Sequence, residues 1–189
     1  MDVKELTYKE ALRQALKEEM TTDESVILLG EDIGEYGGAC GITLGLIEEF
    51  GKERVMDTPA SESAIVGCGI GAAMAGMRPV CELASMDQAA MAFGELLNSA
   101  SRSFYLSGGT VKVPMVIMIP SGFGKGVSQN GQSLESIFAQ IPGLKVIAPS
   151  TPAQAKGMLK AAIRDDNPVI LLENRSLMNM KGPVPETDS

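Results

Sequence analysis

The run Val113-Pro114-Met115-Val116-Ile117-Met118-Ile119 carries no polar side chain and is the clearest indication of how this chain folds. A short apolar run of this kind predicts a strand that is buried on both faces of a sheet. Similar runs flank it, separated by helical patterns. The expected strands are Val26–Leu29, Arg54–Met56, Pro79–Leu83, Leu144–Ala148 and Val169–Glu173. Strands alternating with helices indicate an α/β fold, a three-layer αβα sandwich with a mostly parallel sheet.

The helix starts are marked by capping sequences. Thr7-Tyr8-Lys9-Glu10 is a capping box, and Thr151-Pro152-Ala153-Gln154 caps a helix that runs to about Arg164. Between them the spacing of apolar residues predicts four more helices. They lie near Thr43–Phe50, over Ser61–Met77, over roughly Asp87–Tyr105 and from Ser133 onward. Because only 4% of the residues are aromatic, the twelve methionines and the many small residues must fill the core.

Length and charge narrow the classes of function. The 189 residues suit one main domain, and a net charge of −8 with no basic stripe argues against a nucleic-acid partner. No signal sequence begins the chain, and no apolar run approaches the length of a membrane span. We therefore expect a soluble, cytoplasmic protein without a membrane partner. The cysteines lack metal-site spacing, and Cys68 and Cys81 are expected to be small core residues.

The turn Asp57-Thr58-Pro59-Ala60-Ser61-Glu62-Ser63 is the leading candidate for chemistry. The chain contains no histidine, so proton transfer must use carboxylates, Lys, Tyr, Cys or a cofactor. Ser61 is the expected helix cap, which puts Glu62 in the first turn of a Gly/Ala-rich helix. This turn follows a strand, and open α/β sheets bind ligands at the carboxyl ends of strands. A glutamate there is also explained by the helix dipole alone, so both interpretations stand.

Three further motifs leave alternatives open. Gly67-x-Gly69-x-Gly71 lies inside the expected helix, which favours a small-residue packing face over a dinucleotide site. The glycine-rich loop Ser121–Gly131 is suited either to holding a phosphate through backbone amides or to bordering a ligand site as a mobile loop. The carboxylates of Glu31, Asp32 and Glu35 suit either a divalent cation or a solvated surface, including a subunit contact.

Taken together, several segments resemble a known family. They are Leu28–Gly38, Asp57–Glu62, Ala73–Glu82, Ser107–Gly109, Pro142–Ser150 and Ala162–Val169, in family order and spacing. The family is the β subunit of the thiamine-diphosphate-dependent decarboxylating component of 2-oxo acid dehydrogenases, pyruvate dehydrogenase-like, within the transketolase-like superfamily. The resemblance runs from about Leu6 to Pro185. It implies that residues 1–180 form the pyrimidine-binding domain and that residues 181–189 are a linker toward an absent C-terminal transketolase-like domain.

The resemblance also implies a divided active site. Glu62 matches the glutamate that shares a proton with the pyrimidine ring of thiamine diphosphate and so activates the cofactor for oxidative decarboxylation. An α-type subunit would hold the diphosphate and Mg²⁺. Further partners would be a second β chain, a separate C-terminal chain and a lipoyl acyltransferase core. A monovalent cation, often K⁺, would bind the backbone carbonyls of Met115, Ala162, Ile163, Asp165 and Asn167.

Two positions depart from the family pattern. Met86 stands where the family usually has an aromatic residue stacked on the aminopyrimidine, and Asn130 stands where it has a histidine. An amide binds by hydrogen bonds but does not shuttle a proton near neutral pH. The departures motivate an alternative, a catalytically degenerate or regulatory subunit. Another alternative is a transketolase-like or synthase-type thiamine enzyme with a different acceptor.

Overall fold

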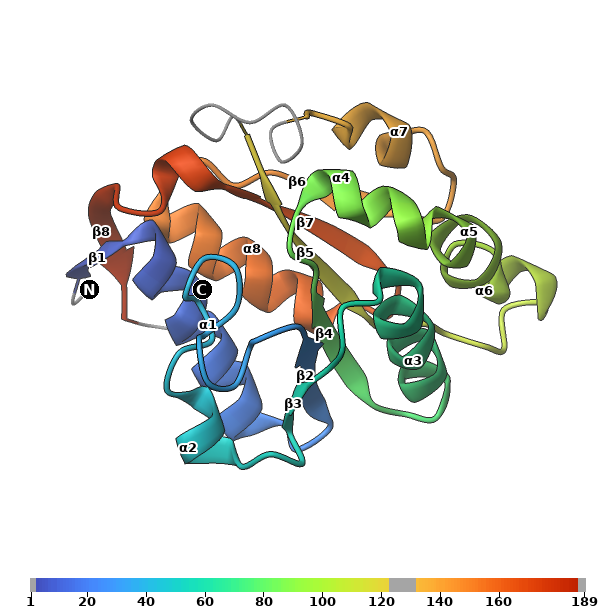
Figure 1. Cartoon of the computed structure of the whole chain (residues 1–189), viewed down its shortest axis with the longest axis horizontal. Helices are drawn as coiled ribbons and strands as arrows, with labels where there is room; N and C mark the ends of the chain where they lie inside the picture. Colours follow the sequence, from blue (N-terminus) through green and yellow to red (C-terminus); the bar gives the residue numbers. More distant parts are fainter. Residues whose placement is uncertain (1–2, 123–131, 187–189) are drawn as a thin grey trace.

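The computed structural model describes residues 3–122 and 132–186. A six-stranded, wholly parallel sheet forms its centre, in the order β3-β2-β4-β5-β7-β6 (Figure 1). The strands are β2 (Val26–Gly30), β3 (Val55–Asp57), β4 (Arg78–Glu82), β5 (Val116–Ser121), β6 (Lys145–Ile147) and β7 (Val169–Asn174). Each expected strand is present. This confirms the α/β fold with a mostly parallel sheet.

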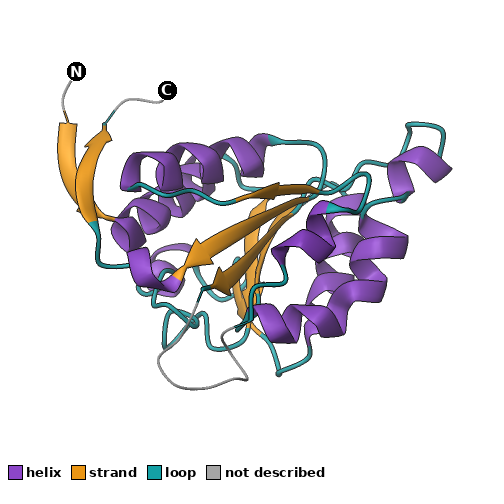
Figure 2. Ribbon diagram, turned by 90° about the horizontal axis from the view of Figure 1, so that it is seen from above, coloured by secondary structure: helices purple, strands orange, loops and turns teal. Residues whose placement is uncertain are grey.

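Helices cover both faces of the sheet and give the three layers visible in Figure 2. On one face, α1 (Tyr8–Thr22), α2 (Leu46–Phe50) and α8 (Pro152–Arg164) share a hydrophobic core with the sheet. On the other face, α3 (Glu62–Met74), the helical segments between Met86 and Leu106 and α7 (Glu135–Ala139) lie over a second core. The capping box of α1 and the Thr151 cap of α8 are both formed, as predicted.

The helix expected over Asp87–Tyr105 is broken into five short segments. They are α4 (Met86–Ala89), η1 (Ala90–Ala92), α5 (Phe93–Glu95), η2 (Leu96–Ala100) and α6 (Ser103–Leu106). Ser101 and Ser103 donate side-chain hydrogen bonds to the carbonyls of Leu97 and Ser99, four residues earlier, at 2.7 and 2.6 Å. Such bonds compete with the helix ladder and bend it at this end of the segment. The prediction of one regular helix was wrong, because the helix type already changes at Ala90.

The sequence did not reveal a second, two-stranded sheet. Strand β1 (Val3–Thr7) pairs antiparallel with β8 (Lys181–Pro185), apart from the central sheet (Figure 2). Residues 181–185, expected to begin a linker, therefore form a strand. The ribbon is anchored to the domain because Tyr8 N donates to Met180 O at 2.8 Å and Val184 is buried in the α1 and α8 core. No helix within the described ranges is long and apolar enough to cross a membrane.

The small residues of α3 pack differently from the prediction. Gly67 and Gly71 are exposed and have open space where a Cβ would lie, so they are not close-packing positions within the described chain. Gly69 is the tight position, because a Cβ there would come within 2.5 Å of Cys81 Sγ. Cys81 is fully buried as expected, but Cys68 is exposed, and the prediction for Cys68 was wrong.

Candidate functional site at the carboxyl edge of the sheet

The carboxyl ends of β2, β3 and β4 lie side by side. Gly30, the last residue of β2, is in register with Asp57 on one side and with Glu82 on the other. Three segments therefore leave the sheet at one place: the loop after Gly30, the Asp57–Glu62 turn and the short link into α4. This is the edge at which α/β sheets bind ligands.

Hydrogen bonds fasten these segments to one another. Gly34 N donates to Asp57 Oδ1 at 2.8 Å, and Thr58 N donates to Gly30 O at 2.9 Å. Ala39 N donates to Glu82 Oε1 at 2.7 Å, which joins the same loop to β4. The loop and the turn that carry the family-like motifs thus form one bonded unit.

Glu62 is the first residue of α3, and its side chain is half-buried. Ser61 occupies the N-cap with an extended backbone, although its side chain makes no capping hydrogen bond. The start of the helix is held instead by Ser63, whose Oγ donates to Met91 O at 2.6 Å. The carboxyl group of Glu62 therefore stands at a fixed helix start, on the turn that follows β3.

A cavity of about 310 Å³ opens beside this edge. It is lined by Glu31, Asp32, Tyr36, Gly38, Ala39, Ala84 and Gln88. Two of these are the carboxylates singled out in the sequence, and Asp32 has the left-handed φ of 56°, a strained value that is common at functional sites. Across the described ranges, no group of three or more acidic or cysteine side chains is arranged to hold a metal ion.

Met86 does not border this cavity. Its side chain is only 2% exposed and belongs to the core beneath α3 and α4. The neighbouring Gln88 lines the cavity instead. Contact of Met86 with an aminopyrimidine ring stays a prediction, and Gln88 is the residue of this helix that the cavity exposes. Asn130 lies outside the described residues.

Buried oxygens without a partner gather at the same edge. Within residues 3–122 and 132–186, five buried side-chain oxygens accept or donate no hydrogen bond: Thr58 Oγ1, Glu82 Oε2, Asp87 Oδ2 and both carboxyl oxygens of Glu173. All belong to the ends of β3, β4 and β7 or to the residues that follow them. Buried polar atoms normally have hydrogen-bond partners. These unpaired oxygens therefore mark a place where the single chain leaves buried polar groups without partners.

Sequence reasoning passed over Glu82 and Glu173 as site residues. The available signal was that each of the two glutamates directly follows an apolar run, Pro79–Cys81 for Glu82 and Val169–Leu172 for Glu173. Burial raises the pKa of Glu82 to about 7, although the hydrogen bond from Ala39 opposes this. Burial also raises the pKa of Glu173 well above its ordinary value, and the nearby carboxyl of Glu82 adds to the effect. Perturbed carboxyl groups of this kind are typical of functional sites.

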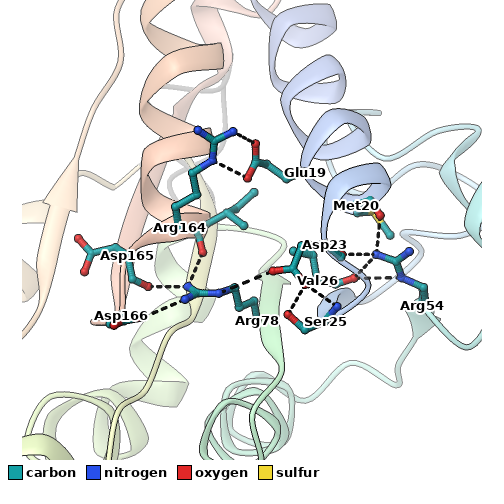
Figure 3. A network of polar contacts seen from close by, with 11 residues as sticks. Glu19, Met20, Asp23, Ser25, Val26, Arg54, Arg78, Arg164, Asp165 and Asp166 are labelled. Carbon is teal, nitrogen blue, oxygen red and sulfur yellow. Dashed lines mark hydrogen bonds and ion pairs between the residues drawn. The ribbon is translucent and has the colours of Figure 1, made fainter. Parts of the chain in front are cut away.

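The expected cation site lies at the opposite edge, around Arg78 (Figure 3). Arg78 Nη1 donates to the carbonyls of Ile163 and Asp165 at 2.9 and 3.1 Å. The carbonyls of Met115 and Ala162 accept from the backbone N–H groups of Val169 and Asp165. Two of the four carbonyls thus accept from the Arg78 guanidinium, and the other two accept from backbone N–H groups.

The fifth residue, Asn167, contacts the Asp165 side chain. Its backbone N and side-chain Nδ2 both donate to Asp165 Oδ1 at 2.9 Å. Burial alone would raise the pKa of Asp165, but hydrogen bonds from Lys145 and Asn167 outweigh it and hold the pKa below the ordinary value. Binding of a monovalent cation at these carbonyls stays a prediction.

Comparison with known proteins assigns the family. The family described as "Transketolase, pyrimidine binding domain" matches residues 4–181. The chain belongs to this family. The chain also resembles a solved structure titled "Split gene transketolase, inactive beta4 tetramer", with a TM-score of 0.72 over 90% of this chain and 51% of that one, at 20% identity. That likeness confirms the transketolase-type fold.

Relatives with higher identity are dehydrogenase subunits. The chain is 47% identical to the "Pyruvate dehydrogenase E1 component subunit beta" of Rhizobium meliloti, covering 97% of this chain and 40% of that protein. It is 48% identical to the "2-oxoisovalerate dehydrogenase subunit beta" of Bacillus subtilis, covering 97% and 57%. The chain therefore spans about half the length of the curated relatives it matches.

Proposed function

We propose that this pyrimidine-binding domain is part of a β-type subunit of a thiamine-diphosphate-dependent 2-oxo acid dehydrogenase. The observation that carries the proposal is the bonded unit at the carboxyl edge. It holds the turn that leads to Glu62 at the edge of the sheet that also carries a polar cavity, in a chain that is nearly half identical to dehydrogenase β subunits.

The residues present fit the pyrimidine half of the cofactor. Glu62 is partly exposed at the start of α3, and Gln88 and Glu31 provide polar groups in the cavity at the same edge of the sheet. The unpaired oxygens at this edge support a polar ligand or partner there. When bound, thiamine diphosphate supplies an electron sink for carbanion chemistry.

Glu62 would hold a proton at the ring nitrogen that it faces. Glu62 lies in the first turn of α3, and its side chain is partly exposed in the single chain. Proton transfer to the ring calls for a site closed to bulk water, which a partner subunit that covers Glu62 would provide. We therefore propose an α-type subunit that covers Glu62 and holds the diphosphate with Mg²⁺.

The proposal is tested with the chain purified together with an α-type subunit. We expect Glu62→Gln to lower 2-oxo acid decarboxylation by at least about a hundredfold, the usual scale for losing a proton-transfer group. Glu48→Gln is the matched control, because Glu48 is an exposed glutamate in the first turn of α2. Unchanged turnover in Glu62→Gln would show that the role of Glu62 is wrong. Cofactor binding without turnover in the unaltered complex would favour the degenerate-subunit alternative.

A further inference from the structure

The end of β4 lies at a fixed place beside the end of β2. Glu82, the last residue of β4, is in register with Gly30, the last residue of β2. The two backbones are in close contact, because a Cβ at Gly30 would come within 2.8 Å of the Glu82 carbonyl oxygen. Since side chains alternate along a strand, the Glu82 side chain points to the same face as Val80, into the core beside α1. With only 4% of its surface exposed, Glu82 extends a carboxyl group from this fixed backbone into the folded chain.

The loop after β2 lies directly on the Glu82 carboxyl group. Ala39 N donates to Glu82 Oε1 at 2.7 Å. Gly38 has a φ of 73°, and a Cβ there would overlap both carboxyl oxygens, so only a glycine lets the backbone approach this closely. Gly38 N donates in turn to Asp32 O at 2.9 Å. One buried carboxyl group thus holds two consecutive loop residues and, through them, Asp32.

Glu82 connects the two segments that form the cavity. The loop after β2 contributes the larger part of the lining: Glu31, Asp32, Tyr36, Gly38 and Ala39. The segment after β4 contributes Ala84 and Gln88. The backbone joins Glu82 to Ala84, two residues later, and the Glu82 side chain joins it to the loop. The reach of this one side chain therefore sets the distance between the two segments.

A second buried contact holds the same loop but lies away from the cavity. Thr43 Oγ1 donates to Ile33 O at 2.7 Å, and Thr43 is 2% exposed. The cavity lining includes neither of these two residues. Loss of either contact should loosen the loop, because each removes a buried hydrogen bond. Only the loss of the Glu82 contact changes the cavity, so the two contacts separate a positioning role from a role in folding.

We propose that Glu82 is a positioning residue of the candidate site. Its carboxyl group fixes the backbone of Gly38 and Ala39, and so fixes the shape of the cavity that takes the pyrimidine half of the cofactor. Binding sites work only when the groups around the ligand are held within about 0.5 Å of the productive geometry. The effect on the cofactor rests on the proposed function, whereas the contact between Glu82 and the loop does not. Glu82 is assigned no contact with the reacting atoms.

The first test measures the loop in the 189-residue chain without cofactor. Glu82→Leu removes the acceptor for Ala39 N at similar side-chain volume, and Glu82→Gln keeps an acceptor oxygen at the same reach. NMR follows the exchange of the Ala39 amide hydrogen with solvent. We expect exchange to be at least about tenfold faster in Glu82→Leu, the scale of one lost hydrogen bond, and to return towards the unaltered rate in Glu82→Gln. Equal exchange in the unaltered chain and in Glu82→Leu would overturn the proposal.

The second test measures the cofactor in the complex with an α-type subunit. Titration calorimetry gives the Kd of thiamine diphosphate in the presence of Mg²⁺, and decarboxylation of a 2-oxo acid gives kcat and the KM for the cofactor. We expect Glu82→Leu to raise Kd and KM at least about tenfold while kcat at saturating cofactor changes less than about threefold, because a wall that holds the ring contributes equally before and during the reaction. Glu82→Gln should restore the affinity. An unchanged Kd in Glu82→Leu would contradict the positioning role.

Two further variants separate positioning from folding. Glu82→Asp keeps the charge but withdraws the carboxyl group by one carbon–carbon bond, so it should weaken cofactor binding as Glu82→Leu does. It carries the test if Glu82→Leu fails to fold. Thr43→Val removes the control hydrogen bond at nearly equal shape and should lower the urea midpoint without changing Kd. A Kd raised equally by Thr43→Val and Glu82→Leu would reduce the role of Glu82 to folding and refute the proposal.

Failure of cofactor binding is distinguishable from failure of Glu82 to position the cavity wall. If the unaltered complex binds no thiamine diphosphate, the proposed function is rejected and the cofactor role of Glu82 falls with it. If the unaltered complex binds the cofactor and both Glu82→Leu and Glu82→Asp bind it equally well, only the role of Glu82 is rejected. Weaker binding in these two variants, with rescue by Glu82→Gln, is the result that the positioning role requires.

Discussion

Replacing Gly38 with alanine adds one Cβ atom where the loop after β2 packs on the Glu82 side chain at the end of β4. Gly38 has a φ of 73°, and the three atoms nearest to an added Cβ all belong to the Glu82 side chain, at 2.1 to 2.5 Å. A left-handed backbone costs a non-glycine residue about 1–2 kcal/mol. Overpacking a filled site adds about 1–3 kcal/mol. We therefore expect Gly38→Ala to lower the free energy of unfolding by about 2–5 kcal/mol.

The chain cannot relieve this clash without losing a buried hydrogen bond. Glu82 is held by the Ala39 N–H on one oxygen and is buried on all sides. If its carboxyl moved aside, the Ala39 N–H would lose its acceptor, and a buried unpaired donor costs about 1–3 kcal/mol. Movement of the loop would break the same bond. Either relaxation leaves a cost comparable with that of the overpacking.

Gly45→Ala is the matched control. Gly45 lies in the same loop region with a φ of 87°, but nothing lies within 4 Å of the position of its missing Cβ. Its alanine variant carries only the backbone penalty of about 1–2 kcal/mol. Urea unfolding followed by far-UV circular dichroism is the suitable assay, because the chain has no tryptophan. Equal losses in the two variants would refute the packing of Gly38 on Glu82.

Three other predictions concern contacts remote from this loop. Arg78→Ala should cost about 1–3 kcal/mol in urea unfolding, because it removes the donor shared by the Ile163 and Asp165 carbonyls (Figure 3); a loss below 0.5 kcal/mol would contradict that role. Glu19→Ala should cost about 1–3 kcal/mol, because the nearly buried Glu19 carboxyl accepts two bonds from Arg164 at 2.9 and 2.7 Å, although the Arg164 side chain is 52% exposed. A loss below about 0.5 kcal/mol, as for an exposed pair, would contradict this role. A thiol reagent should modify the exposed Cys68 in the folded chain but should reach Cys81 only in urea, because Cys81 is buried and burial raises its pKa to about 12. Equal labelling of the two cysteines by mass spectrometry would show that α3 opens readily.

The central sheet and the helix starts were predictable because each rests on local signals. The apolar runs leave little choice except buried parallel strands, and the Thr7 and Thr151 caps are formed by residues three apart in sequence. The β1–β8 ribbon lacks such a signal. Val3–Thr7 includes two charged residues and Lys181–Pro185 includes two prolines, so each strand depends on a partner far away in sequence.

The candidate site was predictable only in part, for a similar reason. The turn bearing Glu62 has a motif that can be read along the chain, and the structure places it at the expected edge. The orientation of α4 cannot be read in that way. Met86 enters the core while Gln88 meets the cavity, and this choice depends on how the helix sits against α3 and β5.

Glu82 and Glu173 show why the least predictable residues of a fold deserve functional tests. Each places an ionisable group where a strand of this sheet otherwise carries apolar side chains, and each leaves buried oxygens unpaired. Such a conflict between local pattern and fold is costly, and folded proteins concentrate these conflicts at functional sites. Both glutamates lie at the edge that also carries Glu62 and the cavity, rather than at the Arg78 edge, where the described carboxylates pair with cationic side chains. The two edges of the sheet thus differ in how their charged groups are paired. At the Arg78 edge the carboxylates pair with cationic side chains of the same chain, whereas at the carboxyl edge buried oxygens need a proton, a ligand or a partner to be paired.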